Sequence, residues 1–319
     1  MTRDIAAAAP LLPLLPCALT SALADVRLDL PALRAQVGQE DVSAQSLEDL
    51  RSKLASALYR TLHTGAPPAD EAPRARSRCD PDLELRFRVG MPHRRTVSPV
   101  RVLERRPAAD GTVLVELDGV RVRLPEARLT SAGPRDLAAH EAARPALSPG
   151  FFFAHGSRGR PPRGPVLRLY VHLRHPDAAV AAWAAALRVL ERQTLPYQAK
   201  VLSAPQHYPR RDALVLYLTA AHQAVADEVA TAVSDVEGLG TSTSALAEPL
   251  APGVAIAWEP ADARPGMQGL SFGQHRAHAV AEGLLAHAQD PRTPQQSAIA
   301  RAMRAASIDP AAPHRNLPA

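Results

Sequence analysis

Residues 46–64 carry the clearest helical pattern in the first third of the chain. Leucines recur there every three or four positions, which places them on one face of an amphipathic helix. Ser46 is a typical N-cap and Gly65 a typical stop. The expected stripe consists of Leu47, Leu50, Leu54, Leu58 and Leu62. The nearest partner for this helix is the segment 31–37, so residues 1–65 are predicted to form a small helical N-terminal unit.

Residues 112–124 alternate between hydrophobic and polar side chains. The segments VLVEL and VRVRL flank Asp118-Gly119, and this arrangement predicts a β-hairpin with a two-residue turn. The predicted buried face consists of Val113, Val115, Leu117, Val120, Val122 and Leu124.

Strand and helix patterns alternate in the C-terminal half. Strands are predicted at 166–173, 197–203 and 213–218, with a turn at Tyr208-Pro209 before the last of these. Helices are predicted from Pro176 to about 193, from about 221 to 236, after Ser271 with its capping-box Gln274, and after Thr293-Pro294. The fold class is therefore α+β, with a mixed or antiparallel sheet and flanking helices in the C-terminal half.

Stretches rich in proline and charge separate these patterns. Residues 67–78 lack periodicity and indicate a linker, and 155–165 form a second connector. We predict four parts: a helical unit at 1–65, a linker at 66–79, a hairpin-containing region at 80–146, and an α/β phosphate-handling domain at 147–319.

The charge of the chain does not indicate a nucleic-acid partner. The formal net charge is +5, but the densest basic runs, at 74–78, 94–106 and 158–163, fall in proline- and glycine-rich connectors. No nucleic-acid-binding motif accompanies them. Cys17 and Cys79 match no metal-ligand spacing, so we expect a reducing compartment, no disulfide, no metal and no cofactor.

The N-terminus has one feature of a secretory signal, an apolar stretch at 6–15 followed by Ala22-Leu23-Ala24. Against this interpretation, Asp4 offsets Arg3 and three prolines interrupt the stretch. No other segment has the roughly 20 apolar residues that span a bilayer. We expect a cytoplasmic protein without membrane association.

Three polar side chains share one face of the predicted strand 166–173. The period of two places Arg168, Tyr170 and His172 together, opposite a face of leucine and valine. A solvated face is the common interpretation of such a pattern. Because the strand lies in a β-α-β run, where a helix covers one face, the other face can instead hold a specific site.

Lys200 stands out because the chain has only two lysines against 35 arginines (37 − 2). A lysine can become a neutral base, which arginine cannot, so Lys200 on a predicted strand is a candidate for proton abstraction. Lys53, on an exposed helix face, shows that a lysine can also persist by chance.

Two further cationic groups lie at element ends. The run Arg210-Arg211-Asp212 directly precedes the strand ALVLYL, where an anion site and a solvated turn are both consistent with the sequence. In the segment SFGQHR, His275 and Arg276 fall in the first turns of a helix, whose free N–H groups favour an anion.

The segments LYVHL, YQAKVL, YPRRDALVLYL, SFGQHR and IDPAAPHRN together resemble the HopA-type effector family. The similarity extends over most of the chain, including ALYRTLH and PALSPGFFFAHGS. Members of this family were named after type III secretion effectors of plant pathogens. Actinobacterial members are lyase components of class V lanthipeptide synthetases, and the family is distantly similar to phosphothreonine lyases.

This resemblance implies elimination of phosphate from phosphoserine or phosphothreonine of a ribosomal precursor peptide, with separate kinase and cyclase components as partners. Lys200 would be the base and His172 the acid. Arg211 and Arg276 would hold the phosphate, and the residues that could assist them are Arg210, Arg168, Tyr170 and Tyr217.

The sequence departs from the lyase pattern in two places. Phosphothreonine lyases carry Lys-x-His on the strand of the acid, whereas this chain has Tyr170-Val171-His172, and Arg276 is the only arginine in the first turns of the late helix, where those enzymes use two. Arg168 could replace the missing cation. These departures keep a second hypothesis open, a non-catalytic protein that binds a phosphorylated or leader peptide. A third, an effector delivered to a host, lacks the expected secretion signals.

Overall fold

The structure, a computed structural model, describes residues 14–68, 79–104, 110–132, 135–145 and 147–318. The chain divides into two compact units. The terminal unit comprises Met1–Glu71, Ser244–Glu248 and Pro260–Ala319, and the central unit comprises Ala72–Thr243 and Pro249–Glu259. Most of the predicted linker and of the signal-like stretch lies outside the described residues. The predicted boundaries at 65, 79 and 146 stay predictions.

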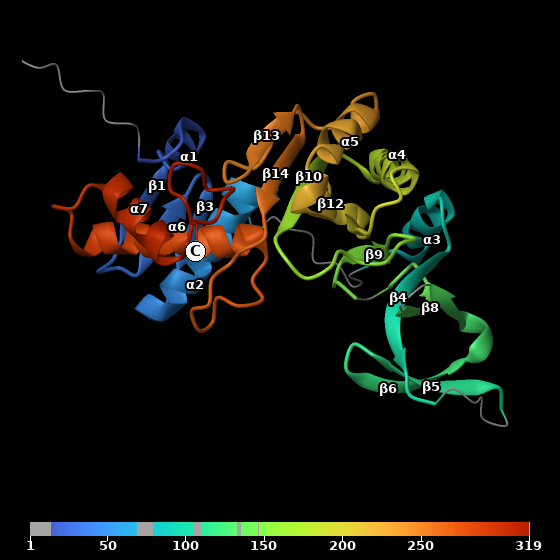
Figure 1. The fold of residues 1–319 in the computed structure, drawn as a ribbon. Coiled ribbons are helices and arrows are strands. Elements are labelled where there is room, and N and C mark those ends of the chain that lie inside the picture. Colours follow the sequence, from blue (N-terminus) through green and yellow to red (C-terminus); the bar gives the residue numbers. More distant parts are fainter. Residues whose placement is uncertain (1–13, 69–78, 105–109, 133–134, 146, 319) are drawn as a thin grey trace, which may run out of the picture. The chain divides into compact units, whose positions relative to one another are not determined.

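The largest sheet of the central unit has six strands in the order β13-β14-β10-β12-β11-β9 (Figure 1). The pairings of β10, β11 and β12 with their neighbours are all antiparallel. The strands are β9 (Phe151–His155), β10 (Val166–Leu173), β11 (Gln198–Leu202), β12 (Arg210–Thr219), β13 (Glu248–Ala251) and β14 (Val254–Trp258). The three predicted strands of this region and the α+β class are confirmed.

Two helices connect the strands of this sheet. Helix α4 (Pro176–Arg192) joins β10 to β11, and α5 (Val225–Val233), shorter than predicted, follows β12. Because β10 and β11 are both antiparallel to β12, they run parallel with β12 between them. The predicted β-α-β run is therefore split. Apart from β9 and β13 of this sheet, the elements follow one another along the chain as β10-α4-β11-β12-α5-β14, and their strands lie in the order β14-β10-β12-β11. Both orders are those of a ferredoxin-like fold.

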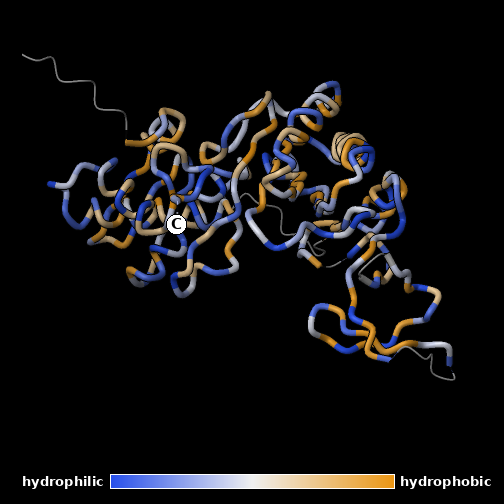
Figure 2. Tube along the Cα trace, in the orientation of Figure 1, coloured by the Kyte–Doolittle hydropathy of each residue, from blue (hydrophilic) through white to orange (hydrophobic). Residues whose placement is uncertain are grey.

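Both helices pack on the same face of the sheet, against the odd-numbered residues of β10. Hydrophobic residues recur along α4 (Figure 2). Trp183 of α4 is fully buried and donates its indole N–H to the carbonyl of Phe87 at 3.1 Å. Phe87 belongs to α3 (Pro81–Gly90), which packs on α4. The even-numbered residues of β10 lie on the opposite face of the sheet from α4 and α5.

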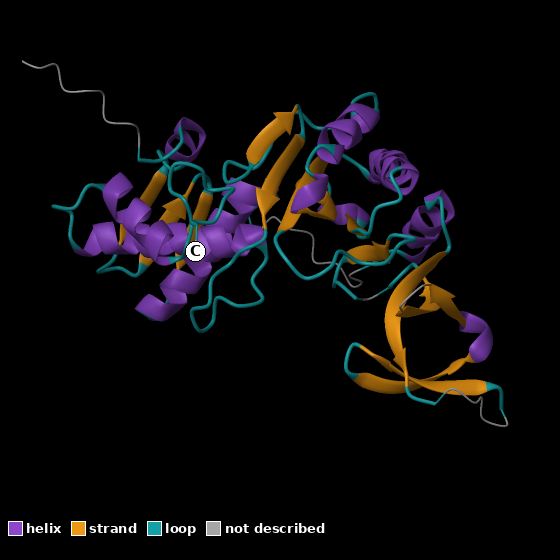
Figure 3. Ribbon diagram, viewed as in Figure 1, coloured by secondary structure: helices purple, strands orange, loops and turns teal. Residues whose placement is uncertain are grey.

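A second sheet of the central unit has five strands in the order β6-β5-β4-β8-β7. Figure 3 shows this part as strands with one short helical turn. The predicted hairpin is β5 and β6, with Asp118 at φ 50° and Gly119 at φ 82° as in a type I′ turn. Val120, predicted to be buried, is 61% exposed because it adjoins the turn. The strands are β4 (Arg95–Val102), β5 (Thr112–Leu117), β6 (Val120–Pro125), β7 (Leu129–Ala132) and β8 (Arg135–Glu141).

In the terminal unit, the predicted N-terminal helix is confirmed. Helix α2 (Leu47–Leu58) begins after Ser46, whose side chain accepts the Asp49 N–H, and continues as a π-helical turn (Tyr59–Thr64). Gly65 ends it in the left-handed conformation, with φ 67°. Of the predicted stripe, Leu50, Leu54, Leu58 and Leu62 are fully buried, whereas Leu47, the first residue of the helix, is 36% exposed.

The segment 31–37, predicted to be helical, is instead a turn followed by a strand. Its side chains alternate, with Ala35 and Val37 buried and Arg34 and Gln36 exposed, and this period of two fits a strand. The segment belongs to a three-stranded antiparallel sheet. The first elements of the unit are α1 (Cys17–Ala22), β1 (Val26–Asp29), β2 (Arg34–Val37) and β3 (Glu40–Ser43).

The terminal unit is completed by helices α6 (Phe272–Gln289) and α7 (Gln295–Ala305), both predicted. Ser271 and Gln274 form the predicted capping box of α6. Arg276 in its second turn is fully buried and fastens the C-terminal segment. Its Nε donates to the carbonyl of Pro313 at 3.0 Å, and its Nη2 donates to Asn316 Oδ1 at 2.8 Å.

Arg276→Leu should destabilise the terminal unit, because the substitution leaves buried carbonyl oxygens without their donor. We expect a loss of about 3–5 kcal/mol in the free energy of unfolding, typical of breaking a buried charged network. Urea titration followed by circular dichroism measures it. The control is Arg304→Ala, since Arg304 is exposed on α7 and should change stability by less than about 0.5 kcal/mol. Equal effects of the two substitutions would contradict the prediction.

Candidate functional site

The face of the six-stranded sheet opposite α4 and α5 gathers several predicted site residues. Directly opposed residues on neighbouring strands share a face. Arg168 on β10 lies opposite Tyr217 on β12, Tyr217 lies opposite Gln198 on β11, and Gln198 lies opposite His155 on β9. A row of polar side chains thus crosses four strands.

A second row on the same face contains Lys200. Tyr170 lies opposite Val215, and Val215 lies opposite Lys200. Two strand spacings separate the backbones of Tyr170 and Lys200, about 10 Å. Lys200 is half-buried, and its Nζ lies 4.4 Å from the centre of the Phe151 ring. Within the described residues, Nζ makes no ion pair or hydrogen bond, so the ring is its one described partner.

His172 and Arg211 meet at a third residue, Ser242. The Ser242 hydroxyl lies 3.2 Å from His172 Nδ1 and accepts a hydrogen bond from Arg211 Nε at 3.3 Å. The Ser242 carbonyl lies 2.9 Å from the same His172 nitrogen. The structure therefore brings the predicted acid and one predicted phosphate ligand into one cluster.

The contacts of His172 fix its tautomer. A carbonyl can only accept, so Nδ1 carries a proton and donates to Ser242. Nε2 is then the nitrogen that can gain or give up a proton. Burial of the ring, assisted by the charges of Arg211 and Arg174, lowers the pKa of His172 below its usual range, although the Ser242 carbonyl opposes this shift. A bound anion would favour the charged imidazolium.

Two glycines allow the loop of Ser242 to approach the strand. The Gly240 N–H donates to the His172 carbonyl at 2.9 Å, and the His172 N–H donates to the Gly253 carbonyl at 2.8 Å. A Cβ on Gly240 would overlap the His172 ring, and a Cβ on Gly253 would overlap the Gly240 carbonyl. Gly253 also has φ 72°, which favours glycine. The ring position of His172 therefore depends on both glycines.

Two predicted phosphate ligands are bonded to carboxylates. The guanidinium of Arg168, only 7% exposed, binds Glu259 through both Nε and Nη2, the latter at 2.6 Å. Arg210 binds Asp212 through Nε and Nη2, each at 2.8 Å. These ion pairs make Arg168 and Arg210 supports of the sheet. Arg211 donates to the Ser242 hydroxyl.

The two tyrosines on this face of the sheet differ in exposure. Tyr170 is 3% exposed, and burial raises the pKa of its hydroxyl well above its usual range, so it remains neutral. Tyr217 is half-buried and lies under the Arg168 guanidinium, 5.1 Å from ring centre to carbon. Tyr170 thus offers a neutral group at the position where the lyase pattern has a cation.

Arg276 lies in the terminal unit, where it binds the C-terminal segment as described above. His275 beside it is equally buried, with Nε2 2.9 Å from Asp262 Oδ2 and Nδ1 2.8 Å from Arg276 Nη1. The capping box also satisfies the Gln274 N–H. The predicted phosphate role of Arg276 stays a prediction, and the described contacts give this residue a structural role.

Ser242 and Glu259 are important neighbours that sequence reasoning missed. Ser242 belongs to the run TSTS after Gly240, which indicates a hydroxyl-rich loop but not the strand that the loop meets. Glu259 directly follows β14, a strand that was not predicted.

The described residues contain no cluster of three or more His, Cys, Asp or Glu side chains suited to a metal ion. Within the same ranges, no helix has the length and apolar character to traverse a bilayer.

His155, at the end of the first polar row, should make stability depend on pH. Burial, followed by the charge of Arg144, lowers its pKa from 6.5 to about 4. Since the folded state keeps His155 neutral while the unfolded state takes up a proton, the free energy of unfolding should fall as the pH falls from 6.5 to 4. His155→Gln should reduce this fall by on the order of 1 kcal/mol, allowing for partial exposure.

Urea titrations of both proteins at several pH values measure this difference. Because burial also lowers the pKa of His140 and His172, part of the fall should remain in the variant. Identical pH profiles for the variant and the unmodified protein would contradict the role of His155.

Comparison with known proteins gives structural and family matches. An effector protein from Pseudomonas syringae pv. syringae strain 61 matches with 16% identity and a TM-score of 0.41 over 53% of this chain and 63% of that chain. The chain thus aligns with less than two thirds of that protein. An effector protein from Pseudomonas syringae pv. tomato strain DC3000 matches with 13% identity and a TM-score of 0.49, over 87% of this chain and 92% of that chain.

A search of curated proteins found no significant match. The profile of the HopA1 effector protein family matches residues 142–315, which include the six-stranded sheet, the Ser242 loop, α6 and α7. Because this match covers more than half of the 319 residues, the chain belongs to the HopA1 effector protein family.

Proposed function

We propose that the central unit eliminates phosphate from phosphoserine or phosphothreonine of a peptide. The observation that carries the proposal is the cluster of His172, Ser242 and Arg211, beside a sheet face that also bears Lys200. An elimination of this kind needs a base, an acid and a cation, and Lys200, His172 and Arg211 would supply one of each.

The reaction balances with these groups. Neutral Lys200 Nζ takes the Cα proton, and the electron pair of that C–H bond forms the Cα=Cβ double bond. The Cβ–O bond breaks, and its electron pair stays on the bridging oxygen, which takes a proton from Nε2 of the His172 imidazolium. The products are a dehydro amino acid and inorganic phosphate. Afterwards His172 is neutral, with its proton on Nδ1 and bonded to Ser242.

The surroundings of Lys200 support its role as a base. No carboxylate among the described residues pairs with its Nζ, which lies over the Phe151 ring. The second lysine of the chain differs in this respect, because Lys53 Nζ lies 2.9 Å from Asp49 and its side chain is 49% exposed. A bound phosphate near Arg211 would also favour the protonated form of His172, as the acid requires.

The proposed function also implies partners for this protein. A separate kinase would supply the phosphate, and a cyclase would consume the dehydro amino acid of a ribosomal precursor peptide, as in lanthipeptide synthesis. A cytoplasmic location suits a reaction on a nascent precursor. These statements rest on the resemblance of the chain to lyase members of its family.

The test is incubation of the full chain with phosphoserine and phosphothreonine peptides, followed by mass spectrometry for loss of phosphoric acid. Lys200→Arg keeps the charge but cannot act as a base, and should lower the rate about 10²–10⁴-fold. The matched control is Lys53→Arg, which should leave the rate unchanged. An unaltered rate in Lys200→Arg would exclude Lys200 as the base.

His172→Gln should lower the rate on phosphoserine by a similar factor, about 10²–10⁴. The loss should be at least tenfold smaller on a peptide with S-phosphorylated cysteine, because a sulfur leaving group needs less protonation. An equal loss on both peptides would show that His172 does not act as the acid.

The alternative is a protein that binds the phosphorylated peptide without reaction. Tyr170, in place of the cation of the lyase pattern, and the ion pair of Arg168 with Glu259 favour it, because both reduce the positive charge available to a leaving phosphate. Tight binding of the phosphopeptide without any loss of phosphate, unchanged by Lys200→Arg, would establish this function instead.

A further inference from the structure

Strand β1 of the terminal unit is an edge of its sheet, which has the order β1-β2-β3. Antiparallel pairing occupies one side of β1 through the register from Val26 opposite Val37 to Asp29 opposite Arg34. The other side points away from the sheet. Edge strands present backbone groups that another chain can pair with.

The backbone contacts identify the outward-facing residues of β1. The Val26 N–H donates to the Leu23 carbonyl at 3.1 Å, and the Val26 carbonyl accepts from Arg27 Nη1 at 3.0 Å. Both partners lie outside the β1–β2 ladder, so the main-chain groups of Val26 face the edge. Because a strand repeats every two residues, the N–H and carbonyl of Leu28 also face the edge. Within the described ranges, neither group of Leu28 has a partner beyond the sheet.

A groove runs beside this edge. A cavity of about 600 Å³ has β1 and the following turn as one wall, and the end of α6 and its connection to α7 as the other. Leu28, Leu284 and Ala288 supply apolar surface, and Arg27 and Asp29 supply charge at the rim. The groove therefore combines an unpaired main-chain edge with an apolar floor.

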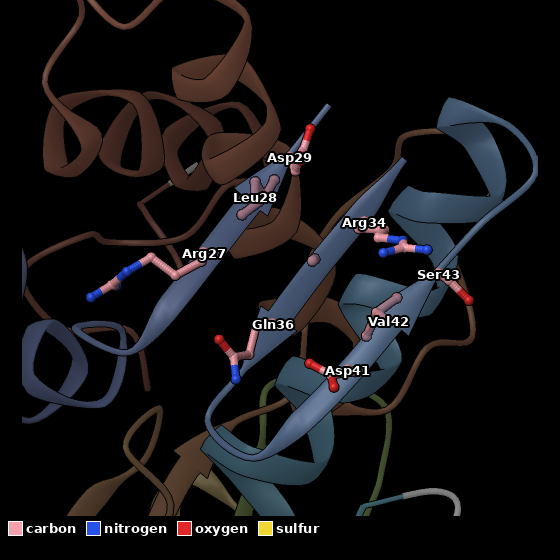
Figure 4. A pocket seen from close by; sticks show the side chains of 9 residues that line it. Arg27, Leu28, Asp29, Arg34, Gln36, Asp41, Val42 and Ser43 are labelled. Atoms are coloured by element: carbon pink, nitrogen blue, oxygen red, sulfur yellow. The ribbon is translucent and has the colours of Figure 1, made fainter. Parts of the chain in front are cut away.

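The outer face of the sheet adds a second feature. Arg27, Gln36 and Asp41 form one cross-strand row and Asp29, Arg34 and Ser43 form another. Figure 4 shows these side chains around a depression of about 510 Å³, with Arg27 extending from β1 away from β2. A fourth strand beside β1 would place its outward side chains next to Arg27 and Asp29, and its inward side chains next to Leu28.

We propose that this groove binds an extended peptide segment, which adds to β1 as a fourth antiparallel or parallel strand. The partner is a peptide with aliphatic residues at alternate positions, because these would pack on Leu28, Leu284 and Ala288. Between them it carries an acidic or hydroxyl side chain beside Arg27, whose side chain is exposed on β1. Strand addition draws its affinity from main-chain hydrogen bonds and its specificity from such alternate pockets.

This site is independent of the elimination chemistry, since all its residues lie in the terminal unit. If the proposed function holds, the segment bound at β1 would belong to the same substrate peptide as the phosphorylated residue but would not contain that residue. Binding at β1 and turnover at Lys200 can therefore be tested separately.

The probe is a pool of capped eight-residue peptides, with valine or leucine at even positions and threonine or glutamate at odd positions, labelled for fluorescence anisotropy with the full chain. A second pool is N-methylated at alternate residues, which removes main-chain donors while the side chains stay. We expect the first pool to bind and the second to bind at least tenfold more weakly. No binding by the first pool, or equal binding by both, would overturn the proposal.

Leu28→Pro removes the N–H that faces outward and breaks no hydrogen bond between β1 and β2. An edge strand tolerates proline at such a position. It should weaken binding at least tenfold, whereas Leu28→Val, which keeps the N–H, should change binding less than threefold. Ala288→Arg, which fills the groove from α6, should weaken binding without altering β1. Unchanged binding in both Leu28→Pro and Ala288→Arg would overturn the proposal. Dimerisation of the full chain that Leu28→Pro abolishes would also overturn it, because the edge would then pair with a second copy.

Discussion

The antiparallel pairing of β10 with β12 is the constraint on which the central unit depends. Its register sets the two faces of the sheet at once. Leu167, Leu169 and Val171 of β10 and the leucines of β12 face α4 and α5, whereas Arg168, Tyr170 and Tyr217 face the other way. A shift of one residue would turn the polar residues into the hydrophobic core. The burial of the odd-numbered residues of β10 therefore positions the polar face, and the proposed chemistry relies on hydrophobic packing behind it.

The elements with a strong local signal could be predicted from the sequence. The Asp118-Gly119 hairpin, helix α2, strand β10 and the capping box at Ser271 are all present as predicted, although Val120 of the hairpin and Leu47 of the leucine stripe are exposed. Strands β1 to β3 are only four residues long, too short for an alternating pattern to be recognised. The order of the strands was not predictable, because it depends on contacts between residues far apart in the chain, such as β14 beside β10.

The candidate site shows the same limit. The residue types of Lys200, His172 and Arg211 could be singled out, yet the sequence could not tell which arginines are occupied by carboxylates. Arg168 is paired with a residue 91 positions away, and the hydroxyl that joins His172 to Arg211 comes from a loop 70 positions from His172. A predicted cation can be judged as a functional candidate only once its partners in the structure are known. Arg276 is a further example, because its guanidinium is buried and donates to the Pro313 carbonyl of the C-terminal segment.

The glycines behind His172 have a consequence for comparing members of this family. The ring is held in place by the absence of side chains on Gly240 and Gly253, and Gly253 lies 81 positions (253 − 172) along the chain. One added methyl group at Gly240 would overlap the imidazole, and one at Gly253 would overlap the Gly240 carbonyl, while every acid, base and cation remained in the sequence. A relative with Lys200, His172 and Arg211 intact could thus have lost its chemistry, so an inventory of family members by their reactive residues alone would misjudge it.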